Sequence, residues 1–143
     1  MIPEEHRAFI AEHRYCVVGT NSRSGPPALS PVFYVLDGEE IVISITTERH
    51  KYRAITRDPQ VSLCIIHEEM PFPYATVYGT GRIDEAGGAD AMVAVSERMF
   101  GRALTDDERA GIDRRVVAEH RVALRVTVDR VIGQQALRER FSR

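Results

Sequence analysis

The sequence contains no tryptophan, a single lysine and only two cysteines among its 143 residues. No apolar run approaches the roughly 20 residues that a membrane-spanning helix needs, so we expect no membrane contact. The first residues, MIPEEHRAF, lack the basic and then apolar order of a secretory signal. These absences together predict a cytoplasmic protein.

Motifs for metal binding, nucleic-acid binding and hydrolysis are also missing. Cys16 and Cys64 lie in separate apolar runs, without the paired spacing of zinc or redox sites, so we expect two buried thiols and no metal. The formal net charge of −2 and the pI of about 6.2 give no field that would attract nucleic acid. HExxH, Walker and Ser/His/Asp signatures do not occur.

Short stretches with alternating apolar and polar residues dominate what is present, and they predict β-strands. The clearest is RVALRVTVDRVIG, in which Val122 and Leu124 would face inward while Arg125 and Thr127 face outward. Six strands are predicted in this way, over residues 15–20, 28–36, 40–45, 60–67, 74–83 and 121–133.

Turn and capping residues separate these strands. Asp37-Gly38 predicts a hairpin, and Thr105 with Glu108 fits a capping box at the start of a helix. Length and composition favour one domain over residues 1–143. We therefore predict an α+β fold, mainly β: a closed or nearly closed antiparallel barrel with short capping helices.

The only lysine, Lys51, lies in the stretch SITTERHKYRAITRDP (residues 44–59). Here a strand that ends in hydroxyl residues leads into a helix, and the unpaired N–H groups of a helix start favour an anion. A lysine stem can lie on the core while its ammonium reaches a pocket mouth. Lys51 and Arg49 would then hold a phosphate against Thr46 and Thr47. The alternative is an ordinary cationic helix face in solvent.

The order of these features resembles the FMN-binding split-barrel family of pyridoxamine 5'-phosphate oxidase-like oxidoreductases, which includes reductases that use the deazaflavin coenzyme F420. The resemblance runs from the first helix to RVTVDRVIG, through strand, turn, strand, Asp-Gly, strand ending in hydroxyls, helix with lysine, and DPxVSL. It implies a six-stranded antiparallel split β-barrel that forms a homodimer, with a flavin-type cofactor in each of two grooves at the subunit interface.

The resemblance also assigns cofactor-binding residues by position. The ring system would lie along the second strand and the end of the third, the phosphate would lie at the following helix, and Tyr74 would reach the cofactor from the partner subunit. The cofactor-binding residues implied are Ser30, Pro31, Val32, Phe33, Ser44, Ile45, Thr46, Thr47, Arg49, His50, Lys51 and Tyr74.

Two departures from the family bear on the activity. True pyridoxamine phosphate oxidases have arginines where this chain has Leu29 and His50, and their C-terminal motif rich in Trp and Arg is absent here. Vitamin B6 oxidation is therefore not expected. Similar length, the V-x-RV-x-G strand and the arginine bias of a high-GC genome favour the F420 branch. The resemblance thus implies hydride transfer by F420 to or from a small unsaturated organic substrate.

Two alternatives stay open. One is an FMN-dependent oxidase or reductase with the same cations on its terminal phosphate, and the other is a non-catalytic protein that binds a cofactor or a tetrapyrrole such as heme. Tyr34, Tyr78 and His67 are candidate proton donors, although each also fits a core or rim position. Substrate contacts are expected from the loop Glu68–Pro73 and from the partner subunit.

Overall fold

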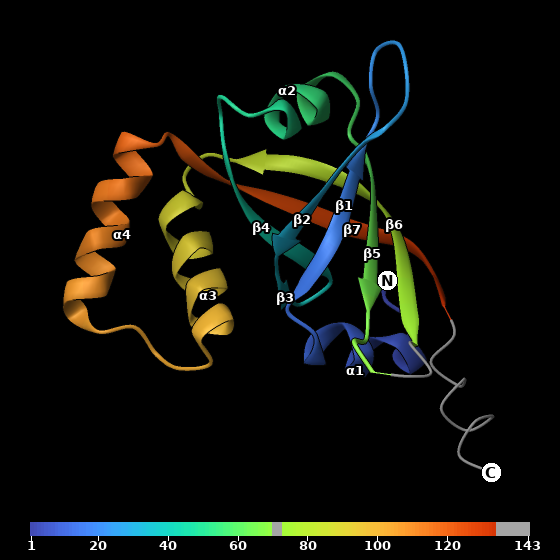
Figure 1. Cartoon of the computed structure of the whole chain (residues 1–143), viewed down its shortest axis with the longest axis horizontal. Helices are drawn as coiled ribbons and strands as arrows, with labels where there is room; N and C mark the ends of the chain where they lie inside the picture. Colours follow the sequence, from blue (N-terminus) through green and yellow to red (C-terminus); the bar gives the residue numbers. More distant parts are fainter. Residues whose placement is uncertain (70–72, 134–143) are drawn as a thin grey trace.

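The computed structural model describes residues 1–69 and 73–133, which form four helices and seven strands (Figure 1). In chain order these are α1 (Glu4–Glu12), β1 (Tyr15–Thr20), β2 (Ala28–Phe33), β3 (Val35–Asp37), β4 (Glu40–Thr46), α2 (His50–Arg57), β5 (Gln60–Ile66), β6 (Tyr74–Asp84), α3 (Gly88–Phe100), α4 (Asp106–Ala118) and β7 (Arg121–Gly133).

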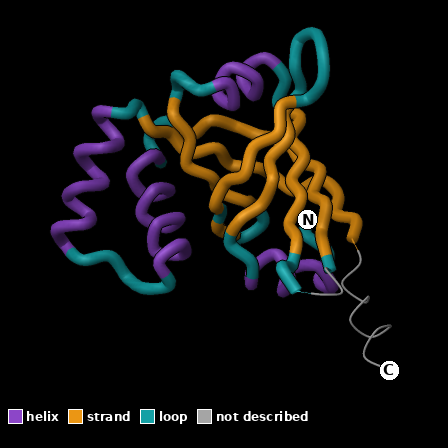
Figure 2. The backbone as a smooth tube through the Cα atoms, viewed as in Figure 1, coloured by secondary structure: helices purple, strands orange, loops and turns teal. Residues whose placement is uncertain are grey.

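All seven strands belong to one antiparallel sheet with the order β2-β1-β5-β6-β7-β4-β3. The sheet curls into a half-barrel, with α1 at one end, α2 at the other, and α3 and α4 packed together at the side (Figures 1 and 2). The predicted α+β barrel with short capping helices is confirmed, and the number of strands is corrected from six to seven.

The additional strand arises because residues 28–36 divide at Tyr34. The side chain of Tyr34 is fully buried, its N–H donates to the carbonyl of Arg14 at 2.9 Å, and its hydroxyl donates to the carbonyl of Ile10 at 2.7 Å. These bonds turn the chain away from β1, so β2 pairs with β1 whereas β3 pairs with β4. β2 and β3 are the two edge strands of the sheet. The chain passes from one edge to the other at Tyr34, which brings the two edges of the half-barrel together.

The core follows the predicted alternation. Val122, Leu124, Val126 and Val128 of β7 are all buried, and the inward face of β4 joins them in one hydrophobic cluster. Burial of this apolar area is the main stabilising term of such a barrel. The alternation also leaves the opposite face of each strand available for polar side chains, and this is where the candidate site lies.

Local signals are confirmed as well. Thr105 and Glu108 form a reciprocal capping box at the start of α4, with bonds of 3.0 and 3.2 Å. Gly101 ends α3 with a φ of +71°, a conformation that favours glycine. The end of α3 and the start of α4 were therefore readable from short-range chemistry.

Cys16 is buried, and burial raises the pKa of its thiol to about 12. The prediction was wrong for Cys64, which is only half-buried because it lies on the strand face opposite the core residues Leu63 and Ile65. Within residues 1–69 and 73–133, no cluster of three or more His, Cys, Asp or Glu residues is arranged to hold a metal ion. In the same described part of the chain, no helix is long and apolar enough to span a membrane.

Candidate functional site

The candidate site is a groove between β2 and β4, which lie near each other without pairing in the sheet. Its volume is about 190 Å³. We call it the cationic groove; it is lined by Pro31, Val32, Ser44, Ile45, Thr46, Arg49, Lys51 and Arg121. None of these described lining residues is acidic, although three are basic.

Lys51, the second residue of α2, bridges the helix to β2. Its Nζ donates to the hydroxyl of Ser30 at 2.9 Å, and its side chain is half-buried. Burial, and then the neighbouring charge of Arg49, hold the pKa of Lys51 below its ordinary value. The two cations thus raise each other's electrostatic energy, and an anion between them would relieve that cost.

The loop between β4 and α2 presents Arg49, and the first turn of α2 presents Lys51. α2 begins at His50, and its N-cap residue Arg49 makes no side-chain capping hydrogen bond. The N–H of Arg49 closes a turn onto the carbonyl of Thr46 at 3.2 Å. The N–H of Thr47 is already used, because it donates to the carbonyl of His120 at 3.1 Å. Lys51 and Arg49 therefore provide the groove's charge at the start of α2, as the sequence predicts.

Most of the predicted cofactor-binding residues come together here. Pro31, Val32, Ser44, Ile45, Thr46, Arg49 and Lys51 line the groove, and Ser30 touches it through Lys51. The side chain of Ile45 is 2% exposed and belongs to the core, so only its backbone faces the groove. That these residues bind a cofactor stays a prediction.

The other four predicted residues do not line the groove of this chain. Phe33 lies at the far end of β2 and meets the ring of Tyr15 at 6.0 Å between centroids. His50 is exposed, and Thr47 faces the turn before β7. Tyr74 begins β6 opposite Ile66, so a role at the groove would require a second subunit.

Arg121 is the groove residue that sequence reasoning missed. It is the first residue of β7 and stands opposite Thr46 in the β4–β7 register. Its Nη1 donates to the hydroxyl of Ser44 at 3.4 Å and its Nε to a carboxylate oxygen of Glu119 at 2.8 Å. The alternating pattern places Arg121 at the start of the clearest predicted strand and on its polar face. The pattern does not reveal that β7 pairs with β4, so it gives no reason to group Arg121 with Lys51.

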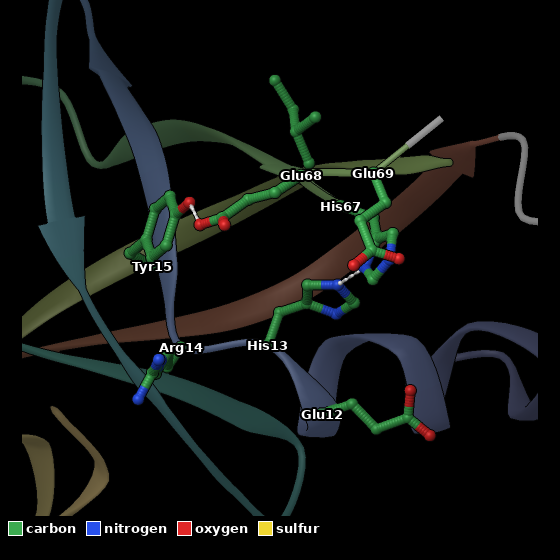
Figure 3. A pocket seen from close by; sticks show the side chains of 8 residues that line it. Glu12, His13, Arg14, Tyr15, His67, Glu68 and Glu69 are labelled. Carbon is green, nitrogen blue, oxygen red and sulfur yellow. Dashed lines mark hydrogen bonds and ion pairs between the residues drawn. The ribbon is translucent and has the colours of Figure 1, made fainter. Parts of the chain in front are cut away.

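A second cavity of about 370 Å³ lies between the end of α1 and the end of β5 (Figure 3). Nδ1 of His13 lies 2.7 Å from the carbonyl of Phe9, and its Nε2 lies 3.0 Å from Nδ1 of His67. A carbonyl only accepts, so we assign a proton to Nδ1 of His13 and another to Nδ1 of His67 in the neutral pair. We call this the imidazole cavity; it is lined by Glu12, His13, Arg14, Tyr15, Ile66, His67, Glu68 and Glu69.

Four of the polar side chains of the imidazole cavity form two hydrogen-bonded pairs. Besides the two imidazoles, the hydroxyl of Tyr15 donates to the carboxylate of Glu68 (Figure 3). The guanidinium of Arg14 points away and donates to the carbonyl of Met99 at 3.4 Å. His67 is thus a rim residue, one of the two positions that the sequence allowed for it.

Tyr34 can be removed from the candidate proton donors. Its hydroxyl is bonded to the carbonyl of Ile10 inside the core, and burial raises its pKa well above the ordinary value. Tyr78 is 40% exposed and packs under the guanidinium of Arg130, 5.3 Å from the ring centroid. Neither tyrosine lines the cationic groove.

Comparison with known proteins identifies the family. Solved structures with the same fold include a conserved hypothetical protein of Mycobacterium tuberculosis (TM-score 0.79, 22% identity, covering 93% of this chain and 84% of that one). An F420 reductase (0.72, 23%, 92% and 98%) and a heme storage protein of Vibrio cholerae (0.66, 17%, 92% and 94%) are also similar. A sequence profile described as pyridoxamine 5'-phosphate oxidase matches residues 2–135, so the chain belongs to the pyridoxamine 5'-phosphate oxidase-like family.

Proposed function

We propose that the protein is an oxidoreductase that binds coenzyme F420 in the cationic groove and transfers a hydride to or from a small unsaturated organic substrate. The observation that carries the proposal is the convergence of Lys51 and Arg49 on a groove whose lining also offers hydroxyl groups and a third cation, and no acidic residue among its described members. Likeness in fold to an F420 reductase supports the choice of cofactor.

The donor set suits a phosphate group. Ammonium, guanidinium and hydroxyl groups all donate hydrogen bonds, and phosphate oxygens accept them. Burial and then the charge of Arg49 lower the pKa of Lys51, and a phosphate between these two cations would offset that cost. Pro31 has no N–H to donate and lies on the wall of the groove, where an apolar ring face can approach the strand.

Within this arrangement each residue has a definite task. Lys51, oriented by Ser30, and Arg49 would fix the phosphate end. Pro31 and Val32 would hold the ring in place and shield one of its faces from water. The cofactor supplies the hydride chemistry when bound, and the protein supplies position and electrostatics. The proton that the substrate takes up along with the hydride would come from solvent or from a residue near the bound substrate.

FMN is the second candidate cofactor, and Arg121 is the observation that favours it. The resemblance argues against FMN, because the family's FMN enzymes carry arginines as phosphate ligands where this chain has Leu29 and His50. Arg121 restores a cation to the groove from a different strand. An FMN-dependent oxidase or reductase would use the same residues on a terminal phosphate.

We also propose that the protein acts as a homodimer with the cofactor at the subunit interface. Large apolar side chains remain exposed on the outer sheet face in a single chain, including Ile66 at 45% and Phe33 at 37%. The resemblance to the split-barrel family implies that a second copy would supply its Tyr74 to the groove. Light scattering coupled to gel filtration tests this proposal, and Ile66→Lys is expected to yield monomers. A monomeric wild-type protein would contradict it.

The cofactor is decided by titration. Because the chain has no tryptophan, the fluorescence anisotropy of F420 or FMN can be followed without indole background when purified protein is added. We expect tight binding of F420 and weak binding of FMN. Tight FMN binding would reverse the order of the two candidates. Binding of neither flavin-type cofactor, with binding of heme instead, would replace both by the tetrapyrrole alternative.

A further inference from the structure

We infer that Arg121 is a ligand-binding residue of the cationic groove, the third cation of its phosphate site, and that Glu119 positions it. This inference rests on the proposed function in so far as it adds a residue to the same groove. The ligand chemistry is that of a phosphate oxyanion, either at the end of a cofactor or in a free phosphate compound.

The sheet register brings Arg121 to the site. Arg121 stands opposite Thr46, the last residue of β4, and reaches Ser44, from which it is separated by 77 residues in the chain. Lys51 enters from the α2 side and Arg121 from the β7 side. The two cations thus approach the groove from two different elements, as expected of groups that enclose an anion.

A strained turn fixes this placement. His120 has a φ of +53°, and it is the only non-glycine residue with positive φ in residues 1–69 and 73–133. This conformation is unfavourable outside glycine and persists where the surroundings determine it. The carbonyl of His120 accepts the N–H of Thr47 at 3.1 Å, which ties the turn before β7 to the loop after β4. The strain therefore lies beside the groove.

The guanidinium of Arg121 is held at one edge. Glu119 accepts its Nε–H at 2.8 Å and also binds Nε of Arg115 at 3.0 Å. Hydrogen bonds from Arg115 and then from Arg121 keep the pKa of Glu119 below its ordinary value, so its carboxylate is ionised. Nη1 of Arg121 points instead toward Ser44 in the groove, where a planar guanidinium can meet phosphate oxygens.

Arg115 provides a matched control. It binds the same carboxylate as Arg121, carries the same charge, and does not line the groove. We would measure binding of inorganic phosphate and pyrophosphate by calorimetry, and of F420 and FMN by anisotropy, for the wild type, Arg121→Gln and Arg115→Gln. Arg121→Gln is expected to weaken binding about 10- to 100-fold, the range of a charge-assisted hydrogen bond. Arg115→Gln is expected to stay within about twofold, as an exposed charge.

Two further variants separate binding from folding. Arg121→Lys keeps the charge and should recover part of the affinity that Arg121→Gln loses. Glu119→Gln keeps an acceptor for Nε while removing the negative charge, so it should tighten phosphate binding at low salt. If Arg121→Gln does not fold, the other two variants test the inference. It is supported if Arg121→Lys binds phosphate more weakly than the wild type and Glu119→Gln binds it more tightly. If Arg121 had only a structural role, the salt dependence of phosphate binding would be the same in Arg121→Gln as in the wild type.

The outcomes distinguish the two proposals. Phosphate binding that requires Arg121, without binding of F420 or FMN, would support the inference and overturn the proposed function. Cofactor binding that is equal in Arg121→Gln and Arg115→Gln would overturn the inference and leave the function standing. Binding of none of the four probes by the wild type would overturn both.

Discussion

Neighbouring parts of β2 lie in different electrostatic surroundings. In the middle of the strand, Ser30 and Pro31 border a groove with three cations and no acidic residue among its described lining residues. At its last residue, Phe33 meets Tyr15 beside the imidazole cavity, where His13 pairs with His67 and Tyr15 with Glu68. The imidazole cavity is the larger of the two, yet its two imidazoles, and its tyrosine and Glu68, already hydrogen-bond each other.

This difference indicates where a ligand is needed. Bringing like charges together costs free energy unless something compensates, whereas a donor that meets an acceptor is already compensated. Because Lys51 and Arg49 face each other with no acidic residue among the groove's described lining residues, the cationic groove is the better candidate for an anionic ligand. Cavity volume alone would have favoured the imidazole cavity.

The largest expected effect separates the two regions directly. Replacing Lys51 with Met should weaken binding of the phosphate-containing cofactor about 10- to 100-fold, because a charge-assisted hydrogen bond is lost. Arg53→Gln removes a charge from the exposed side of the same helix and should change the affinity less than about twofold. Anisotropy titrations measure both. Equal losses of affinity in the two variants would mean that any positive charge on α2 contributes equally, and that the groove has no special role in binding.

A substitution in the imidazole cavity should lower the stability of the protein and leave its affinity for phosphate unchanged. His13→Ala removes the hydrogen bonds to Phe9 and His67 and the ring contact with Phe9 at 4.2 Å. We expect the free energy of unfolding to fall by about 1–3 kcal/mol, with phosphate affinity unchanged. Urea unfolding and calorimetry give the two numbers. A stable variant with weaker binding would show that the cavity takes part in the site.

Tyr34 directly follows β2 and ties the end of that strand to α1, so its substitution tests what holds this side of the comparison in place. Tyr34→Phe deletes the hydroxyl that donates to Ile10 while keeping the ring that the core encloses. The free energy of unfolding should fall by about 1 kcal/mol, because one buried hydrogen bond is lost and its acceptor is left unpaired. Chemical denaturation is the measurement. No change would mean that the chain division at Tyr34 depends on packing and not on this bond.

The smallest effect concerns pH. The pKa of Lys51 is lower in the folded protein than in the unfolded chain, so its charge destabilises the fold at neutral pH. Lys51→Met should therefore unfold at a higher denaturant concentration than the wild type at pH 7. That advantage should shrink as the pH rises through the folded pKa toward about 10.4, the unfolded value, because the wild-type lysine then loses its proton. An advantage that grows with pH would show that the charge of Lys51 does not destabilise the fold.

Local patterns sufficed for much of the fold. Alternation in β4 and β7, the capping box at Thr105 and the stop at Gly101 depend on neighbours within a few residues, and each was predicted. The division of residues 28–36 was missed because it depends on bonds from Tyr34 to α1 and to the residue before β1. A tyrosine in an apolar run gives no sign of which partner it will find.

The candidate site divides in the same way. Lys51, Arg49 and Thr46 lie within one short stretch, so their meeting could be predicted from strand, turn and helix signals. Arg121 joins them only through the pairing of β4 with β7, which the alternation of neither strand specifies. Residues 70–72, part of the loop from which we expect substrate contacts, lie outside the described residues.

The pairing of β4 with β7 also sets the order in which the site can form. Closing a long loop is entropically costly, and pairings between distant segments form late and slowly. Lys51 and Arg49 can reach their helix early in folding, whereas Arg121 arrives only when the last strand docks on β4. A phosphate ligand that needs all three cations thus recognises the finished barrel and no earlier stage. Such a ligand would slow unfolding more than it speeds folding, and so prolong the lifetime of the native protein.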